Sequence, residues 1–246
     1  AGTPPASCSG TPVYSGTATS FTHTGLVNGT VYGYRLCAVD GAGNVTVGLV
    51  ASAYPAPEYA PPTGTLAQAN GTTLTRTLSV TLSLSATDAS TVKSMCLSNT
   101  AACPAWENFA TTRTWTLSTG GAGARTVSLW LRDVWGNTTT GPVKLSVTYD
   151  PTPPANGALA LTTGGGRVSL SWSGFLDGHS GIETYTVVQG ATAAPVSCAT
   201  GTQLYRGATP AFVHDGVSPG VRQYYRVCAT DRAGNLSSGV AGSIVA

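Results

Sequence analysis

The chain has 246 residues, of which 41% are hydrophobic and 9% are charged, with a formal net charge of +2. This charge excludes a basic field for nucleic acid or anionic lipid, and no run of about 18 apolar residues could span a membrane. The 31 glycines and 15 prolines suit short strands joined by turns. Because no segment has a useful helical apolar period, the sequence predicts an all-β chain.

One motif recurs along the chain and defines its repeat. YRLCAVDGAGN (34–44) returns as YRVCATDRAGN (225–235), with a weaker copy, WLRDVWGN (130–137), between them. Each copy predicts a strand, a tight turn and the start of a return strand. The copies lie roughly 100 residues apart, which is the size of one immunoglobulin-like sandwich.

Residues 1–54 match only the second half of a module. From Pro5 onward they align with the segment from Pro195, and the opening strands that precede the later copy are absent from this chain. A sandwich without those strands exposes an apolar face and unpaired edges. Three explanations stay open: the chain is a window of a longer repeat protein, another chain supplies the strands, or this region folds differently.

Two proline-rich linkers, 55–62 and 150–154, separate the remaining modules. Residues 63–149 form a middle module, in which 79–86 alternates between apolar and polar residues as a half-buried strand does. Residues 155–246 predict a complete module of six or seven strands. Further strands of the middle module are expected at 91–99, 112–118, 125–133 and 142–149.

The third module carries a family resemblance. Residues 153–246 resemble a bacterial fibronectin type III domain, through VSLSWSGF with Trp172 and through GVSPGVRQYYRVCATDRAGNLS. Residues 5–54 resemble the second half of the same module. Residues 63–149 are similar to a bacterial Ig-like repeat, through VKSMCLSN and TTRTWTLSTGGAGARTVSLWLRDVWGN. The resemblance implies tandem Ig-like and fibronectin type III β-sandwiches, the first one incomplete.

The family usually has a tyrosine corner before its sixth strand. The first module matches this pattern with Leu26 and Tyr32, six residues apart, whereas the third has Val217 and Gln223 at these positions. The corner is therefore expected in the first module and not in the third.

Six cysteines, an even number, favour a disulfide-forming compartment. The repeat predicts the pairs Cys8–Cys37 and Cys198–Cys228, which leaves Cys96 with Cys103. Strand parity turns Cys37 and Cys228 away from the core, so these bridges would lie on the sheet surface. No CxxC pair suggests zinc, and we expect no cofactor. The N-terminus lacks signal-peptide features, so a signal was removed or the chain begins inside a longer protein.

The recurring D-x-x-G-N turns are weak calcium candidates, because carboxylate and amide oxygens suit hard cations. Each turn offers a single carboxylate, from Asp40, Asp133 or Asp231. Turn chemistry is the favoured interpretation, in which Asp caps its own backbone and Gly-Asn takes positive φ. We predict no other metal site.

The sequence gives little support to catalysis. LDGHSG (176–181) holds Asp177, His179 and Ser180, but neighbours on one loop cannot usually align as nucleophile, base and orienter, and no GxSxG motif accompanies them. His23 and His214 are repeat-equivalent residues beside phenylalanines, which favours a structural role. We therefore expect that the chain is not an enzyme.

Tryptophans are the remaining candidates, four of them clustered in the middle module. Parity turns Trp130 outward, and Trp130 and Trp135 are candidates for a surface that stacks on sugars or on a protein. Trp130 can equally cover its own sheet under a neighbouring loop.

These features predict a non-catalytic extracellular structural or interaction protein. It would be a spacer, an adhesive stalk or a subunit of a surface assembly or filament, with its first module completed by strand complementation. The expected partners are other protein chains, including copies of itself, or surface glycans, at an extracellular or cell-surface location that the resemblance implies is bacterial. The alternative is a carbohydrate- or surface-binding accessory region of a larger secreted enzyme.

Overall fold

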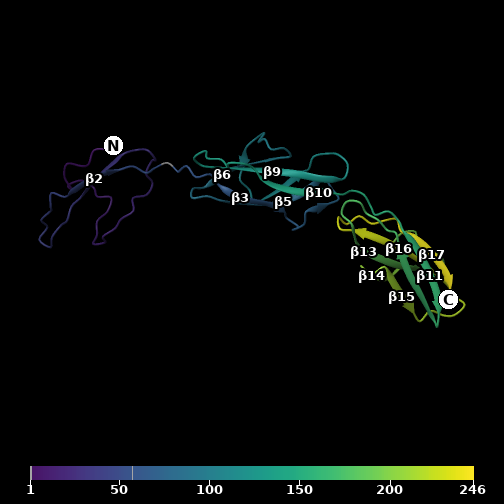
Figure 1. Cartoon of the computed structure of the whole chain (residues 1–246). Helices are drawn as coiled ribbons and strands as arrows, with labels where there is room; N and C mark the ends of the chain where they lie inside the picture. Colours follow the sequence, from purple (N-terminus) through teal and green to yellow (C-terminus); the bar gives the residue numbers. More distant parts are fainter. Residues whose placement is uncertain (1, 57) are drawn as a thin grey trace. The chain divides into compact units, whose positions relative to one another are not determined.

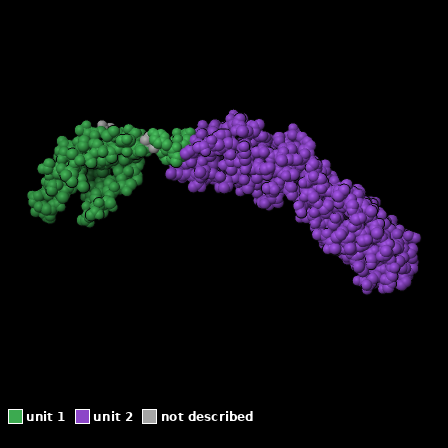
Figure 2. Space-filling view, viewed as in Figure 1, with its two compact units in different colours: residues 1–60, 134–137 green, residues 61–133, 138–246 purple. Residues whose placement is uncertain are grey.

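The computed structural model describes residues 2–56 and 58–246, and every regular element in them is a strand. The chain separates into two compact units (Figure 2). One is the N-terminal part up to Ala60 with residues 134–137, and the other comprises residues 61–133 and 138–246. No helix that could cross a membrane is found among the described residues.

The third module is a complete sandwich of two antiparallel sheets (Figure 1). The three-stranded sheet has the order β11 (Ala158–Gly164), β12 (Arg167–Ser173), β15 (Ala211–Asp215). The four-stranded sheet has the order β14 (Thr202–Gly207), β13 (Ile182–Gly190), β16 (Arg222–Asp231), β17 (Val240–Val245). This division of seven strands into three and four is the fibronectin type III arrangement that the sequence predicts.

The core of the third module is built by alternation along the strands of both sheets. Residues 168, 170 and 172 of β12 point inward from one sheet, and Val187, Tyr225 and Val227 meet them from the other. Trp172 contacts the rings of Tyr185 and Tyr205, with centroids 5.5 and 5.9 Å away. Apolar residues at a period of two therefore close this module on itself.

The middle module is an Ig-like sandwich. One sheet has the order β3 (Thr63–Gln68), β5 (Ser79–Thr87), β8 (Thr112–Thr116). The other has the order β4 (Leu74–Thr75), β10 (Val143–Tyr149), β9 (Gly123–Asp133), β6 (Val92–Ser98), β7 (Glu107–Asn108), with β4 parallel to β10. In β5 the apolar residues are buried and the serines and threonines between them are exposed, as the alternation predicts.

The first module contains a single hairpin. Strands β1 (Tyr32–Leu36) and β2 (Leu49–Ala53) pair antiparallel, and the described residues before Tyr32 form no strand. Leu36 is 70% exposed, whereas Val227, its equivalent in the third module, is fully buried. The inward face of this hairpin therefore has no opposing sheet to cover it.

Candidate functional site: the open side of the first module

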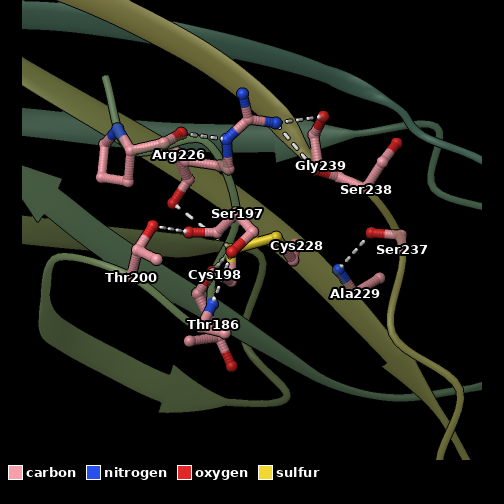
Figure 3. The surroundings of a disulfide bond; sticks show 12 residues. Thr186, Ser197, Cys198, Thr200, Arg226, Cys228, Ala229, Ser237, Ser238 and Gly239 are labelled. Atoms are coloured by element: carbon pink, nitrogen blue, oxygen red, sulfur yellow. Dashed lines mark hydrogen bonds between the residues drawn. A yellow bond between two sulfur atoms is a disulfide. The ribbon is translucent and has the colours of Figure 1, made fainter. Parts of the chain in front are cut away.

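The first module keeps the internal contacts of the corresponding half of the third module. The Arg35 guanidinium donates to the carbonyl oxygens of Pro5 and Val47, each at 2.6 Å. Arg226 makes the equivalent bonds in the third module, to Pro195 and to the segment before β17 (Figure 3). This arginine holds the segment before the first cysteine of each module against the sheet.

The aromatic contacts are repeated as well. The rings of Tyr14 and Phe21 are in tilted contact with centroids 5.0 Å apart, and His23 Nδ1 lies 3.2 Å from Tyr34 Oη. The third module has the same pairs: Tyr205 with Phe212 at 5.6 Å, and His214 Nδ1 with Tyr225 Oη at 2.9 Å. Both histidines are thus bonded to a tyrosine of their own module, in agreement with a structural role.

The tyrosine corner is present in the first module, as the sequence predicts. Val27 N donates to Tyr32 Oη at 3.0 Å, which ties the turn to the start of β1. In the third module Gln223 occupies this position and accepts a 2.7 Å bond from Gln189 Nε2 on β13. No equivalent of β13 exists among the described residues of the first module.

The missing strand leaves a groove. In the third module β13 lies between β14 and β16, with Val187 opposite both Tyr205 and Val227. The first-module counterparts of those two strands are residues 11–16 and β1. The space between them is a groove of about 470 Å³. Its walls include Val13, Tyr14, Phe21, His23, Tyr34 and Leu36.

Three disulfides are formed: Cys8–Cys37 and Cys198–Cys228, which the repeat predicts, and the remaining pair Cys96–Cys103. Cys198 Sγ lies 3.7 Å from Thr186 O and 4.0 Å from Arg226 O, so this bridge crosses the outer face of the sheet (Figure 3). Cys228 is nonetheless fully buried, because the segment that carries Cys198 covers it.

The first and third D-x-x-G-N turns are closed by their own side chains. Asp40 accepts from the backbone N–H of Ala42 and Asn44 and from the Asn44 amide, at 2.8 to 3.0 Å. These bonds, the Asn44 side chain first, lower the pKa of Asp40. Only glycines among the described residues have positive φ. Gly43 has the expected positive φ, of 89°, whereas the expectation for Asn44 is wrong, and the Asn44 side chain bonds to the carboxylate instead.

Asp231 makes the same turn with Asn235 but belongs to a larger acidic cluster. Its carboxylate, with those of Asp150 and Asp177, contributes oxygens that lie within 4.8 Å of one another. Asp150 and Asp231 are fully buried. Burial favours a higher pKa of Asp150, but hydrogen bonds from Ser180 and Thr152 outweigh it, so the pKa of Asp150 is lowered.

Two further expectations from the sequence concern the carboxylates of Asp177 and Asp133. Asp177 Oδ1 accepts the backbone N–H groups of Ser180 and Gly181 at 2.8 and 2.6 Å, so LDGHSG is a carboxylate-capped turn. Asp133 is buried at the end of β9, 3.4 Å from the Ser90 hydroxyl that donates to it. Calcium binding at Asp40, Asp133 or Asp231 stays a prediction.

The tryptophans of the middle module differ in accessibility. Trp130 is half-buried, and its indole N–H donates to Ala101 O at 2.9 Å, in the loop that Cys96–Cys103 closes. This contact fits the second of the two roles considered for it, and a binding role of Trp130 stays a prediction. Trp135 is 53% exposed and remains a candidate for a binding surface.

Comparison with known proteins gives one relative in sequence. No family model matches the chain. The chain is 30% identical over 249 residues to Exoglucanase B of Cellulomonas fimi, an alignment that covers 93% of this chain and 21% of that protein. The chain thus spans about a fifth of the length of the curated relative that it matches.

Two solved structures have partial similarity to the chain. The fibronectin(III)-like modules of Clostridium thermocellum CbhA are 13% identical, with a TM-score of 0.43, and the match covers 70% of this chain and 86% of that one. A tandem domain fragment of titin is 14% identical, with a TM-score of 0.45, over 88% and 74% of the two chains. By its own strand order, the chain has an Ig-like and a fibronectin type III sandwich after the partial first module, and such modules are generally non-catalytic.

Proposed function

We propose that this chain is a non-catalytic, extracellular accessory region of a larger secreted glucan-degrading enzyme, in which the sandwiches act as spacers. The observation that carries the proposal is the 30% identity to Exoglucanase B over 93% of this chain, with only 21% of that protein covered. The three disulfides support an oxidising, extracellular compartment. The stalk and filament alternatives have no comparable observation in their favour.

A spacer must resist bending at its linkers, and the second linker has bonds suited to this. Asn235 Nδ2 donates to Asp150 O at 2.7 Å, and Ser180 N donates to Asp150 Oδ2 at 3.1 Å. Both bonds fasten the start of the 150–154 linker to the third module. The prolines that follow Asp150 restrict the linker further.

The test joins this chain to a glucan-degrading catalytic domain and compares it with a version that lacks residues 61–246. A spacer gives the catalytic domain reach, so we expect equal activity on a short soluble substrate and lower activity of the deleted version on an insoluble glucan. Equal activity of the two proteins on both substrates would overturn the proposal.

A second candidate, direct contact with the polysaccharide, is favoured by Trp135. Its exposed ring could stack on a sugar face. We expect Trp135→Ala to lower the fraction of chain that sediments with an insoluble glucan. Leu176→Ala, which removes an exposed apolar side chain of the third module, is the matched control and should change nothing. If both variants sediment like the parent chain, Trp135 has no such role.

A further inference from the structure

We propose that the groove of the first module is a binding site for a β-strand, and that its occupant is a polypeptide of the sequence type of β11–β13. The strand equivalent to β13 would enter between residues 11–16 and β1. This inference concerns how the first module is completed and does not depend on the proposed function.

The third module fixes the register of the incoming strand. There Tyr185, Val187 and Gln189 of β13 lie opposite residues 229, 227 and 225 of β16. The repeat places Ala38, Leu36 and Tyr34 of the first module at those three positions. The residue equivalent to Val187 would therefore lie opposite Leu36, which lines the groove.

The edge of β1 that faces the groove is open. β1 pairs only with β2 among the described strands, whereas its equivalent β16 pairs with β13 on one side and β17 on the other. An open edge presents backbone N–H and C=O groups that an added strand can bond. The groove thus offers main-chain bonds as well as apolar contact.

The walls of the groove are already arranged for such a strand. The ring contacts of Tyr14, Phe21, His23 and Tyr34 have the geometry that their equivalents have around β13. A site whose side chains are in place loses little conformational entropy when it binds. Binding would cover Leu36 and Val13, which are now 70% and 57% exposed.

The chemistry of the walls favours a peptide over a sugar. Arg35 is the one residue with a permanently charged side chain that lines the groove, and its guanidinium is already bonded to Pro5 and Val47. The remaining wall is mainly aromatic and aliphatic. Because apolar side chains and a sheet edge are what β13 meets in the third module, the same kind of strand fits here.

The experiment replaces residues 1–4 of the full chain by a second copy of residues 153–194. The copy then joins Pro5 as the original joins Pro195, which is the residue equivalent to Pro5. We expect amide exchange in Tyr32–Leu36 to slow by about a thousandfold, as the hairpin becomes part of a cooperative sandwich. Exchange in the original third module should not change. The matched control carries Val187→Asp in the donated copy only, and the added protection should disappear.

Three results would overturn the proposal. One is no added protection with the intact donor, and another is equal protection with the Val187→Asp donor. The third is self-association of the unmodified chain that Leu36→Asp abolishes, since the occupant would then be the same open face of a second copy and not a strand of the β13 type. If the fusion aggregates, a peptide of residues 180–194 is titrated into the full chain; saturable binding that shifts the Leu36 signals supports the proposal, and its absence at millimolar peptide refutes it.

Discussion

Residues 11–24 of the first module and their equivalents in the third have closely related sequences and different structures. In the third module this stretch forms β14 and β15, whereas in the first module it forms no strand. β14 pairs only with β13, and β15 only with β12. Since the described residues of the first module include no equivalent of β12 or β13, the comparison indicates that partner strands, not local sequence, decide the strand state here.

Contacts that close within one half of the module behave in the opposite way. The Asp–Asn turn, the arginine bonds, the histidine–tyrosine pair and the disulfide all form in both modules. Each of these joins residues of the shared C-terminal half. These bonds therefore form without the strands of the N-terminal half, and only the burial of the inward face is lost.

The largest difference in stability is expected between Asp substitutions of the equivalent residues Val227 and Leu36. Val227→Asp places a charge in a full core, and we expect it to destabilise the third module by about 4 kcal/mol or more. Leu36→Asp lies on an open face and should change stability by less than about 0.5 kcal/mol. Urea unfolding of each variant measures the difference. Similar losses for both would mean that the first module has a closed core.

Removal of either of the two repeated disulfides should also affect the first and third modules differently. Cys8–Cys37 and Cys198–Cys228 span 29 and 30 residues, so the chain-entropy model gives each about 3 kcal/mol. Replacing both cysteines of the third module by serine should lower its unfolding free energy by about that amount, with the fold retained. The same change in the first module should abolish its residual structure, because no core remains to hold it. Amide chemical-shift dispersion distinguishes the two outcomes.

A smaller change in stability is expected on substitution of Asp150, and it should depend on pH. Its pKa is lower in the folded chain than in an unfolded one, so its contribution is complete above the unfolded value, about 3.9, and is lost as pH falls through the folded value. Asp150→Asn should cost the third module about 1–2 kcal/mol at neutral pH, since the amide accepts fewer N–H bonds. The variant should also lose less stability on acidification. Parallel stability curves for parent and variant between neutral pH and pH of about 3 would contradict this.

Much of the fold could be predicted from the sequence where apolar residues alternate. The strands of the middle and third modules with clear patterns, such as β5 and β16, fall close to their expected positions. Two of the disulfide pairs followed from the repeat of both partners, and the third was the pair that remained. β14 and β3 were harder, because TQLYRG and TGTLAQ mix polar residues and glycine, and the two-residue strands β4 and β7 carry no periodic signal.

The site residues were less predictable, for physical reasons. Asp150, Asp177 and Asp231 come from a linker, a loop and a strand, and only the folded third module brings their carboxylates together. Strand parity placed Trp130 on the outer face, but it could not show that the loop closed by Cys96–Cys103 brings the Ala101 carbonyl to the indole. The groove itself was expected as an exposed apolar face, whereas its ordered walls required the structure.

The most direct test of this account is amide hydrogen exchange on the unmodified chain, comparing Tyr32–Leu36 with Arg222–Asp231. These strands have equivalent sequences, and only the second has a partner on each edge. An open first module should show fast exchange throughout the first segment, and the closed third module should show slow exchange, limited by its unfolding, in the second. Equal protection of the two segments would mean that the first module is closed by strands on both edges of β1.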